Sequence, residues 1–347
     1  MKIQGEEKMT TIRYNNNIGT PIYAETTVEE LRKMPEFAEI SDRIIFRGLS
    51  AGTDESQLEI RDVAYANRGG CAPDLIYGLK RVQELVNLGV KISYNVYSDD
   101  EIAENPRLAD ARVYYFPCGD ESKPFVVFIS GGGFEDNWNI TQAFPCCAMI
   151  NELGYNAFAL DYRVIRKGEK GLMPAPFEDV AAAIKFIFSH KELFKVNYDN
   201  YAVSGLSAGG TCAAEWGTDN FGYKVYGMPK PAALLLGYPV TVFTPDSIER
   251  LLNNIVGDDR SAENCSKYCV LEHVDSDYPP AFVYHTKNDK FVPFNETLSF
   301  IDKLNEKHID NKLKAVEKGH HGYAIGNGTM SEGWINEAIS FWEAHMK

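Results

Sequence analysis

Gly205-Leu206-Ser207-Ala208-Gly209-Gly210 is the stretch of sequence that decides the fold. It follows a short apolar run, Tyr201-Ala202-Val203, which predicts a buried strand, and it opens a predicted helix. A serine between two glycines at a sharp turn from strand to helix lies at a helix N-terminus, where free N–H groups favour developing negative charge. The pattern therefore indicates a nucleophilic serine at position 207 rather than a simple turn of small residues.

Strands and helices alternate from about residue 91 to the end of the chain. Short apolar runs predict strands at 92–97, 113–116, 125–129, 157–160, 201–203, 232–236, 281–284 and 314–316, and helices are expected at 142–153, 180–188 and 333–346. Alternating elements of this kind predict an α/β fold, with a mostly parallel central sheet and helices on both faces. Functional residues then gather in loops at the carboxyl ends of the strands.

A glycine-rich loop, Ser130-Gly131-Gly132-Gly133-Phe134, ends the predicted strand at 125–129. Acyl transfer passes through a tetrahedral oxyanion, which backbone N–H donors can hold when glycines let the backbone come close to the substrate. The loop could also be a flexible turn or a phosphate-binding loop. No lysine follows it at the spacing of a phosphate-binding loop, which makes the phosphate interpretation poor.

A serine hydroxyl needs a base to activate it and an acid to orient that base. Asp289 follows the strand at 281–284, and the pair His320-His321 follows the last strand. The order Ser207, Asp289, histidine is one that serine hydrolases with an α/β sheet share. These residues alone do not decide which of the two adjacent histidines is the base.

Residues 1–88 carry helix signals but no run of buried strands, and we expect them to form a helical segment ahead of a catalytic domain at 89–347. Thr27 and Glu30 have the spacing of a capping box. Apolar helical faces occur at Val28, Leu31 and Met34, and again at Leu79, Val82, Leu85 and Val86. Exposed apolar faces are unfavourable, so we predict that this segment docks as a cap at the mouth of the pocket.

The net charge of −14 argues against binding to nucleic acid or to anionic membrane surfaces, because both need clustered Lys and Arg. Seven cysteines without a CxxC pair do not form a disulfide framework, and Cys146-Cys147 lies in an apolar stretch typical of buried thiols. The polar start of the sequence lacks the apolar core of a signal peptide, and no stretch is long enough to span a bilayer. We therefore expect a cytoplasmic protein.

The residues from about Lys91 onward resemble the α/β-hydrolase superfamily. Within it, the chain is similar to the carboxylesterase group that includes the hormone-sensitive-lipase-like and acetyl-esterase-like enzymes. The resemblance rests on Ser130-Gly131-Gly132-Gly133-Phe134, Asp161-Tyr162-Arg163, Asp179-Val180-x-Ala182-Ala183, Gly205-Leu206-Ser207-Ala208-Gly209-Gly210, Asp289 and His321-Gly322-Tyr323. One departure is Ser130, which stands where the family usually has a histidine before the glycines.

The resemblance implies a role for each matching residue. The N–H groups of Gly132, Gly133 and Ala208 would form the oxyanion hole. His321 is favoured over His320 because the family places its histidine directly before Gly-Phe or Gly-Tyr. Asp161 and Arg163 would be structural rather than catalytic.

The expected activity is a serine carboxylesterase that hydrolyses small-molecule esters of acetyl-like or aryl acyl groups, by analogy also on carbohydrates. No metal or organic cofactor is expected. A serine peptidase with the same fold is an alternative, and so is a non-catalytic binding protein on this scaffold.

Overall fold

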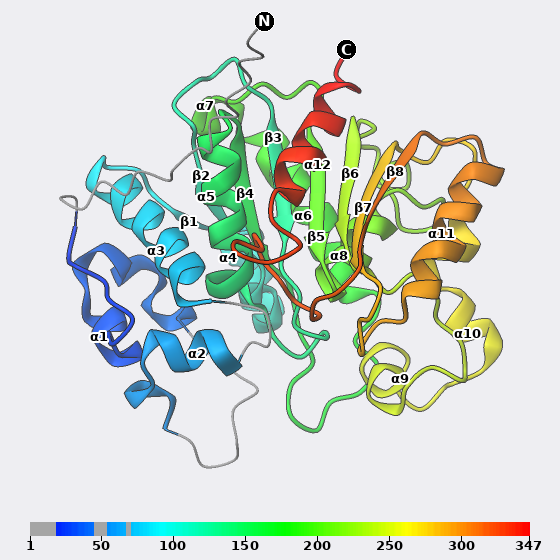
Figure 1. The fold of residues 1–347 in the computed structure, drawn as a ribbon, viewed down its shortest axis with the longest axis horizontal. Helices are drawn as coiled ribbons and strands as arrows, with labels where there is room; N and C mark the ends of the chain where they lie inside the picture. Colours follow the sequence, from blue (N-terminus) through cyan, green and yellow to red (C-terminus); the bar gives the residue numbers. More distant parts are fainter. Residues whose placement is uncertain (1–18, 45–53, 67–70) are drawn as a thin grey trace, which may run out of the picture.

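A mostly parallel sheet forms the centre of the molecule in the computed structural model, which describes residues 19–44, 54–66 and 71–347 (Figure 1). Its eight strands have the order β1-β2-β4-β3-β5-β6-β7-β8. The strands are β1 (Ser93–Asn95), β2 (Arg112–Phe116), β3 (Phe125–Ile129), β4 (Asn156–Asp161), β5 (Ala202–Leu206), β6 (Ala233–Gly237), β7 (Ala281–Thr286) and β8 (Asn311–Val316). Only β1 and β2 pair antiparallel with their neighbours, so the predicted fold class is confirmed.

The eight predicted strands are all present, with small differences at their ends. β3 has the predicted bounds. β1 is shorter than predicted, and it ends three residues before Ser98, whose capping box begins α4 (Asp99–Glu104). β7 is longer than predicted and includes His285, whose side chain is buried.

Both faces of the sheet are covered, as the alternation of side chains along β3 illustrates. Val126 and Phe128 belong to one apolar core, and Phe125, Val127 and Ile129 belong to the other. The first core includes α5 (Phe144–Glu152) and α12 (Trp334–Glu343). The second includes α6 (Ala175–Ser189), α8 (Ala208–Glu215) and α11 (Phe294–Glu306). The predicted placement of helices on both faces is therefore confirmed.

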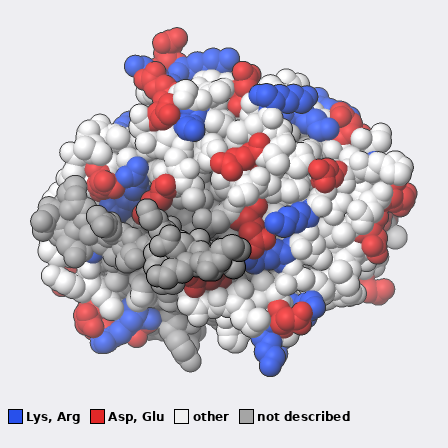
Figure 2. All heavy atoms as spheres, turned by 45° about the horizontal axis from the view of Figure 1, so that its top comes forward, with Lys and Arg blue, Asp and Glu red and all other residues white. Residues whose placement is uncertain are grey.

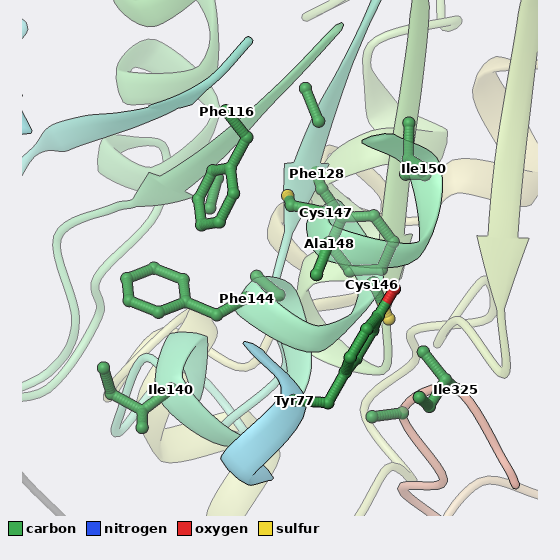
Figure 3. Close-up of a cluster of buried hydrophobic side chains, with 14 of the residues drawn as sticks. Tyr77, Phe116, Phe128, Ile140, Phe144, Cys146, Cys147, Ala148, Ile150 and Ile325 are labelled. Atoms are coloured by element: carbon green, nitrogen blue, oxygen red, sulfur yellow. The ribbon is translucent and has the colours of Figure 1, made fainter. Parts of the chain in front are cut away.

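The N-terminal part of the chain is helical and packs on the first core. Its elements are α1 (Val28–Lys33), η1 (Pro35–Arg43), η2 (Glu55–Gln57), α2 (Ile60–Ala66) and α3 (Ala72–Asn87). The capping box at Thr27 is confirmed. The two predicted apolar faces join the core, and Tyr77 of α3 lies against the Cys146 side of α5 (Figure 3). That these helices act as a cap stays a prediction.

One N-terminal side chain reaches the end of a central strand. The Nη1 atom of Arg43 lies 3.9 Å from Oδ2 of Asp161, at the end of β4. The other guanidinium nitrogen, Nη2, donates 2.8 Å to the carbonyl oxygen of Ala109. Asp161 is 5% exposed, and its partners also include Tyr114 and Asn139. The helical segment is thus tied to the sheet by charge as well as by apolar packing.

The connection between β6 and β7 contains short helices. These are α9 (Glu249–Ile255), α10 (Ala262–Ser266) and η5 (Val270–His273). The backbone around Asn253 and Asn254 accepts hydrogen bonds from Gly171 and Leu172. The sequence analysis predicted no element here. The remaining elements are η3 (Pro106–Asp110), η4 (Asn139–Ala143) and α7 (Lys191–Phe194).

The surface carries charges of both signs. On the face shown in Figure 2, Lys and Arg side chains lie close to Asp and Glu side chains. None of the helices in the described ranges has the length and apolarity needed to cross a bilayer.

Candidate active site

Ser207 occupies the turn between β5 and α8 with a backbone conformation that residues other than glycine rarely adopt. Its φ is 53° and its ψ is −124°, a strain typical of functional sites. The neighbouring glycines make the turn sterically feasible. A Cβ atom on Gly205 would lie 2.2 Å from the carbonyl oxygen of Gly209, and one on Gly209 would lie 2.3 Å from the carbonyl oxygen of Ile129. The geometry of this turn therefore requires glycine at both positions 205 and 209.

The three residues predicted to form the triad lie together in a hydrogen-bonded chain. Nε2 of His321 is 2.8 Å from Oγ of Ser207, and Nδ1 of His321 is 2.7 Å from Oδ2 of Asp289. His320 is exposed, and its ring lies 6.0 Å from the ring of Tyr323. Of the two adjacent histidines, His321 is thus the one that faces the serine.

The side chain of Asp289 is fully buried and receives four hydrogen bonds. Its Oδ1 accepts from the backbone N–H groups of Phe291 (2.7 Å) and Val292 (3.1 Å), and its Oδ2 is shared by His321 and His285. Burial raises the pKa of Asp289, but the hydrogen bonds from His285 and His321 outweigh it and hold the pKa well below its ordinary value. Asp289 is therefore ionised at neutral pH.

Two ring side chains beside the triad were not predicted from the sequence. His285 is buried four residues before Asp289, and its place in an apolar strand does not distinguish it from a core residue. Tyr238 follows β6 with a φ of 37°, and its ring meets the ring of His321 edge to face at 4.6 Å. The Tyr238 hydroxyl donates to the carbonyl oxygen of Tyr323 in the same loop as His321. These contacts hold the imidazole of His321 from the side.

The glycine loop after β3 runs directly beside the serine. A Cβ atom on Gly131 would lie 3.0 Å from Cβ of Ser207. The carbonyl oxygen of Gly131 accepts from the N–H of Trp138 (3.1 Å). In a trans peptide the C=O and the next N–H point in opposite directions. The N–H of Gly132 is therefore turned away from Trp138.

The next peptide of the loop is held in the same manner. The carbonyl oxygen of Gly132 accepts from the N–H groups of Glu135 (3.0 Å) and Asp136 (3.2 Å), which turns the N–H of Gly133 the opposite way. Within the described residues, no protein acceptor receives the N–H of Gly132 or Gly133. Two of the three predicted oxyanion donors thus have a fixed direction and are free of protein partners in that part of the chain.

Two buried amide side chains support the loop from either end. Oε1 of Gln142 accepts from the N–H of Gly131 (2.8 Å), and Nδ2 of Asn254 donates to the carbonyl oxygen of Gly133 (3.1 Å). Oγ of Ser130 is buried without a hydrogen-bond partner among the described residues. Side-chain support for the loop therefore comes from η4 and α9 rather than from the side chain of Ser130.

Arg163 and Asp161 are held by buried polar partners away from the triad. Nε of Arg163 lies 2.9 Å from Oδ1 of the buried Asp179, and Asp161 is enclosed by the partners described above. Neither is bonded to the triad residues. Within the described ranges, no group of three or more His, Cys, Asp or Glu side chains is arranged to hold a metal ion.

The arrangement brings a hydroxyl, a base that accepts its proton, and an ionised acid into one chain. A partly exposed serine at a helix N-terminus, beside backbone N–H groups of fixed direction, is suited to nucleophilic attack on a carbonyl group. Acyl transfer is the reaction class that uses all of these groups.

Known proteins with similar sequence or structure agree with this site. The chain is 24% identical over 234 residues to endo-1,4-beta-xylanase B of Butyrivibrio fibrisolvens, which is 63% of this chain and 35% of the relative. It is 28% identical over 199 residues to the Mycobacterium tuberculosis protein named as carboxylic ester hydrolase LipM, which is 53% of this chain and 45% of the relative. The chain thus spans less than half the length of these two relatives.

A solved structure shows the same fold. The acetyl ester-xyloside bifunctional hydrolase of Caldicellulosiruptor lactoaceticus aligns with a TM-score of 0.63 at 23% identity, over 73% of this chain and 95% of the other. The profile of the BD-FAE family matches residues 112–304, which is more than half of the chain and includes Ser207 and Asp289. By this match the chain belongs to the BD-FAE family, in the carboxylesterase group of α/β hydrolases.

Proposed function

We propose that this protein is a serine carboxylesterase with Ser207 as nucleophile, His321 as base and Asp289 as the acid that orients the base. The observation that carries the proposal is the continuous hydrogen-bond chain from Oγ of Ser207 through His321 to Oδ2 of Asp289. Serine peptidases share such a chain. Family membership and the esterase names among the relatives favour esters over peptides.

Each group has a defined step in this reaction. Nε2 of His321 takes the proton of Ser207 as Oγ attacks the ester carbonyl carbon. The carbonyl oxygen becomes an oxyanion, which the N–H groups of Gly132, Gly133 and Ala208 would stabilise. His321 then gives its proton to the departing alcohol, leaving an acyl group on Ser207. Water, activated by the same imidazole, releases the acid and restores the serine.

The substrate we propose is a small acyl ester on a carbohydrate. One relative is named as a xylanase and another as a carboxylic ester hydrolase. The first name supports a carbohydrate substrate, and the second supports cleavage of an ester bond. The chemistry requires only an acyl carbonyl that can reach Ser207 between the glycine loop and His321. The acyl group we propose is acetyl-like or aryl.

Active-site labelling and a substrate panel test this function. A fluorophosphonate probe should label the native protein on Ser207, and the Ser207→Ala variant should resist labelling while keeping its thermal unfolding midpoint. The same pair should be compared on phenyl acetate and on acetylated xylo-oligosaccharides, with a loss of roughly 10⁴-fold or more in the variant. Hydrolysis by Ser207→Ala at near-native rates would reject the assignment.

The N-terminal segment has a proposed role at the active site. Residues 1–88 would shape the pocket rim, and the contact between Asp74 of α3 and Asn327 in the loop after His321 supports this role.

A reducing, cytoplasmic compartment is supported by seven free cysteines, of which Cys146 and Cys147 are fully buried. An unchanged unfolding midpoint in dithiothreitol is expected, and a drop would indicate disulfides instead.

A further inference from the structure

His285 is a buried histidine that touches the acid of the site but has no step in the proposed reaction. It lies near the end of β7 and is 0% exposed. Its Nε2 is 3.2 Å from Oδ2 of Asp289, and its Nδ1 is 2.6 Å from Oγ1 of the buried Thr297 in α11. Asp289 Oδ2 is therefore shared by two imidazoles, His285 and His321.

The hydrogen-bond partners fix which nitrogen of His285 carries the proton. An ionised carboxylate only accepts hydrogen bonds, so His285 must present an N–H at Nε2 to Asp289. Nδ1 of the neutral ring is then an acceptor, and the hydroxyl of Thr297 can donate to it. Asp289 thus selects the tautomer, and Thr297 holds the His285 ring by its other nitrogen.

We propose that His285 is a positioning residue that shares the charge of Asp289 and thereby sets the position of the acid limb in the pH profile of the reaction. A second N–H donor on the same oxygen weakens the attraction of Asp289 for the positively charged His321 imidazolium. A variant without this donor should therefore need a higher pH to reach its full rate. The inference rests on the proposed function, because the charge of His321 affects the rate only if His321 is the base.

Other titratable groups face the same place and must be separated from His285. Burial, with Asp289 nearby, raises the pKa of Glu296 in α11 to about 7, although the N–H of Val242 opposes the shift. Burial holds the pKa of Tyr238 and Tyr284 well above the ordinary value, so both stay neutral. Lys290, in the same loop as Asp289, is exposed. Glu296 is thus the neighbour that titrates in the range of interest.

The pH dependence of kcat/KM tests the inference, measured with phenyl acetate by pH-stat titration of the released acid. In His285→Leu the acid limb should move to higher pH by about 0.5 to 1 unit. His285→Gln should restore the limb toward its native position, because a side-chain amide N–H can replace the donor. His273→Gln removes a histidine that pairs with Asp219 instead of Asp289, and it should leave the limb in place.

A second variant keeps the test decisive if His285→Leu does not fold. Thr297→Val removes the hydroxyl that bonds Nδ1 and holds the His285 ring toward Asp289, and the limb should move in the same direction. Repeating each variant in a Glu296→Gln background should leave the shift unchanged. A limb that stays in place or moves to lower pH overturns the inference, as does an equal loss of rate at every pH. No hydrolysis by the native protein would instead overturn the proposed function, and this inference with it.

Discussion

Asn254 and Gly133 are separated by 121 positions in the chain, yet the side-chain amide of Asn254 donates a 3.1 Å hydrogen bond to the carbonyl oxygen of Gly133. Asn254 is 6% exposed and also donates to Oε1 of Glu135 (2.9 Å). Helix α9 thus holds the glycine loop at the point where the proposed oxyanion would form.

Asn254→Ala should lower kcat by about 10-fold with KM within about twofold, because a loosened loop weakens oxyanion binding more than ground-state binding. Steady-state kinetics on phenyl acetate checks this. Asn253→Ala is a matched control one position away, since its side chain contacts Glu249 and Arg260 instead. Equal kcat values for the two variants would show that the hydrogen bond to Gly133 has no effect on the reaction.

His321→Ala should lose at least roughly 10³-fold in kcat, whereas His320→Ala should stay near the native rate. The reason is geometric, because only His321 lies within hydrogen-bond distance of Ser207. Fluorophosphonate labelling rates give the same comparison without turnover. If the His320 variant were the inactive one, the base would have been assigned to the wrong residue.

Asp289→Asn should reduce kcat by roughly 10⁴-fold, because an amide presents N–H to the histidines and favours the wrong tautomer of His321. Stability should fall as well, because the two backbone N–H groups that bond Asp289 lose a charged acceptor. Kinetics and thermal unfolding of the same sample separate the two effects. A mild kinetic defect would point to another acid.

Asp74→Asn should stabilise the protein at neutral pH. Burial raises the pKa of Asp74 to about 6, above the value of about 3.9 in an unfolded chain. The folded state therefore keeps this proton to higher pH, and the free energy of unfolding falls as the pH rises from about 4 to about 6. The amide of the Asp74→Asn variant cannot ionise, and its oxygen can still accept the hydrogen bond from Asn327.

Urea unfolding at pH 4.5 and 7.5 measures this effect. The two proteins should be similarly stable at the lower pH, with Asp74→Asn ahead by on the order of 2 kcal/mol at the higher pH. Asp199→Asn, at an exposed position, should show no such trend. A difference that is independent of pH would contradict the assignment of the effect to Asp74 ionisation.

The cap prediction for residues 1–88 is tested at its contact with the histidine loop. Asn327→Ala removes the hydrogen bond to Asp74 and should raise KM for longer p-nitrophenyl esters more than for the acetate ester. Asn220→Ala, which loses an exposed hydrogen bond to Lys267, is the control. An unchanged preference across ester lengths, with intact folding, would leave these helices a purely structural layer.

The sequence predicted the parts of the fold whose signal is local. The buried run at 125–129 and the capping box at Thr27 were found because strand apolarity and cap spacing are written in a few adjacent residues. Ser207, Asp289 and the histidine pair could be proposed together because each follows a predicted strand, and the family resemblance favoured His321, which the structure places beside Ser207. α11 was missed, although its apolar positions are spaced as in a helix.

Asn254 and His285 could not be found by the same reasoning. Each matters through a partner brought close by the sheet, and neither lies in a motif. Asn254 sits in a short helix of seven residues, too short for a helical period to stand out. His285 continues an apolar strand, where a buried histidine resembles any other core residue.

The ion pair between Arg43 and Asp161 has a consequence for how the chain can be divided. A protein expressed from Gly89 onward would leave the buried carboxylate at the end of β4 without Arg43, and would expose the side of α5 that α3 covers. A buried carboxylate that loses an attractive cation destabilises the fold, and so does an exposed apolar face. The helical segment and the sheet should therefore unfold together in a single cooperative transition. Chimeras with a homologous protein joined at this boundary should fold only if they keep both Arg43 and Asp161.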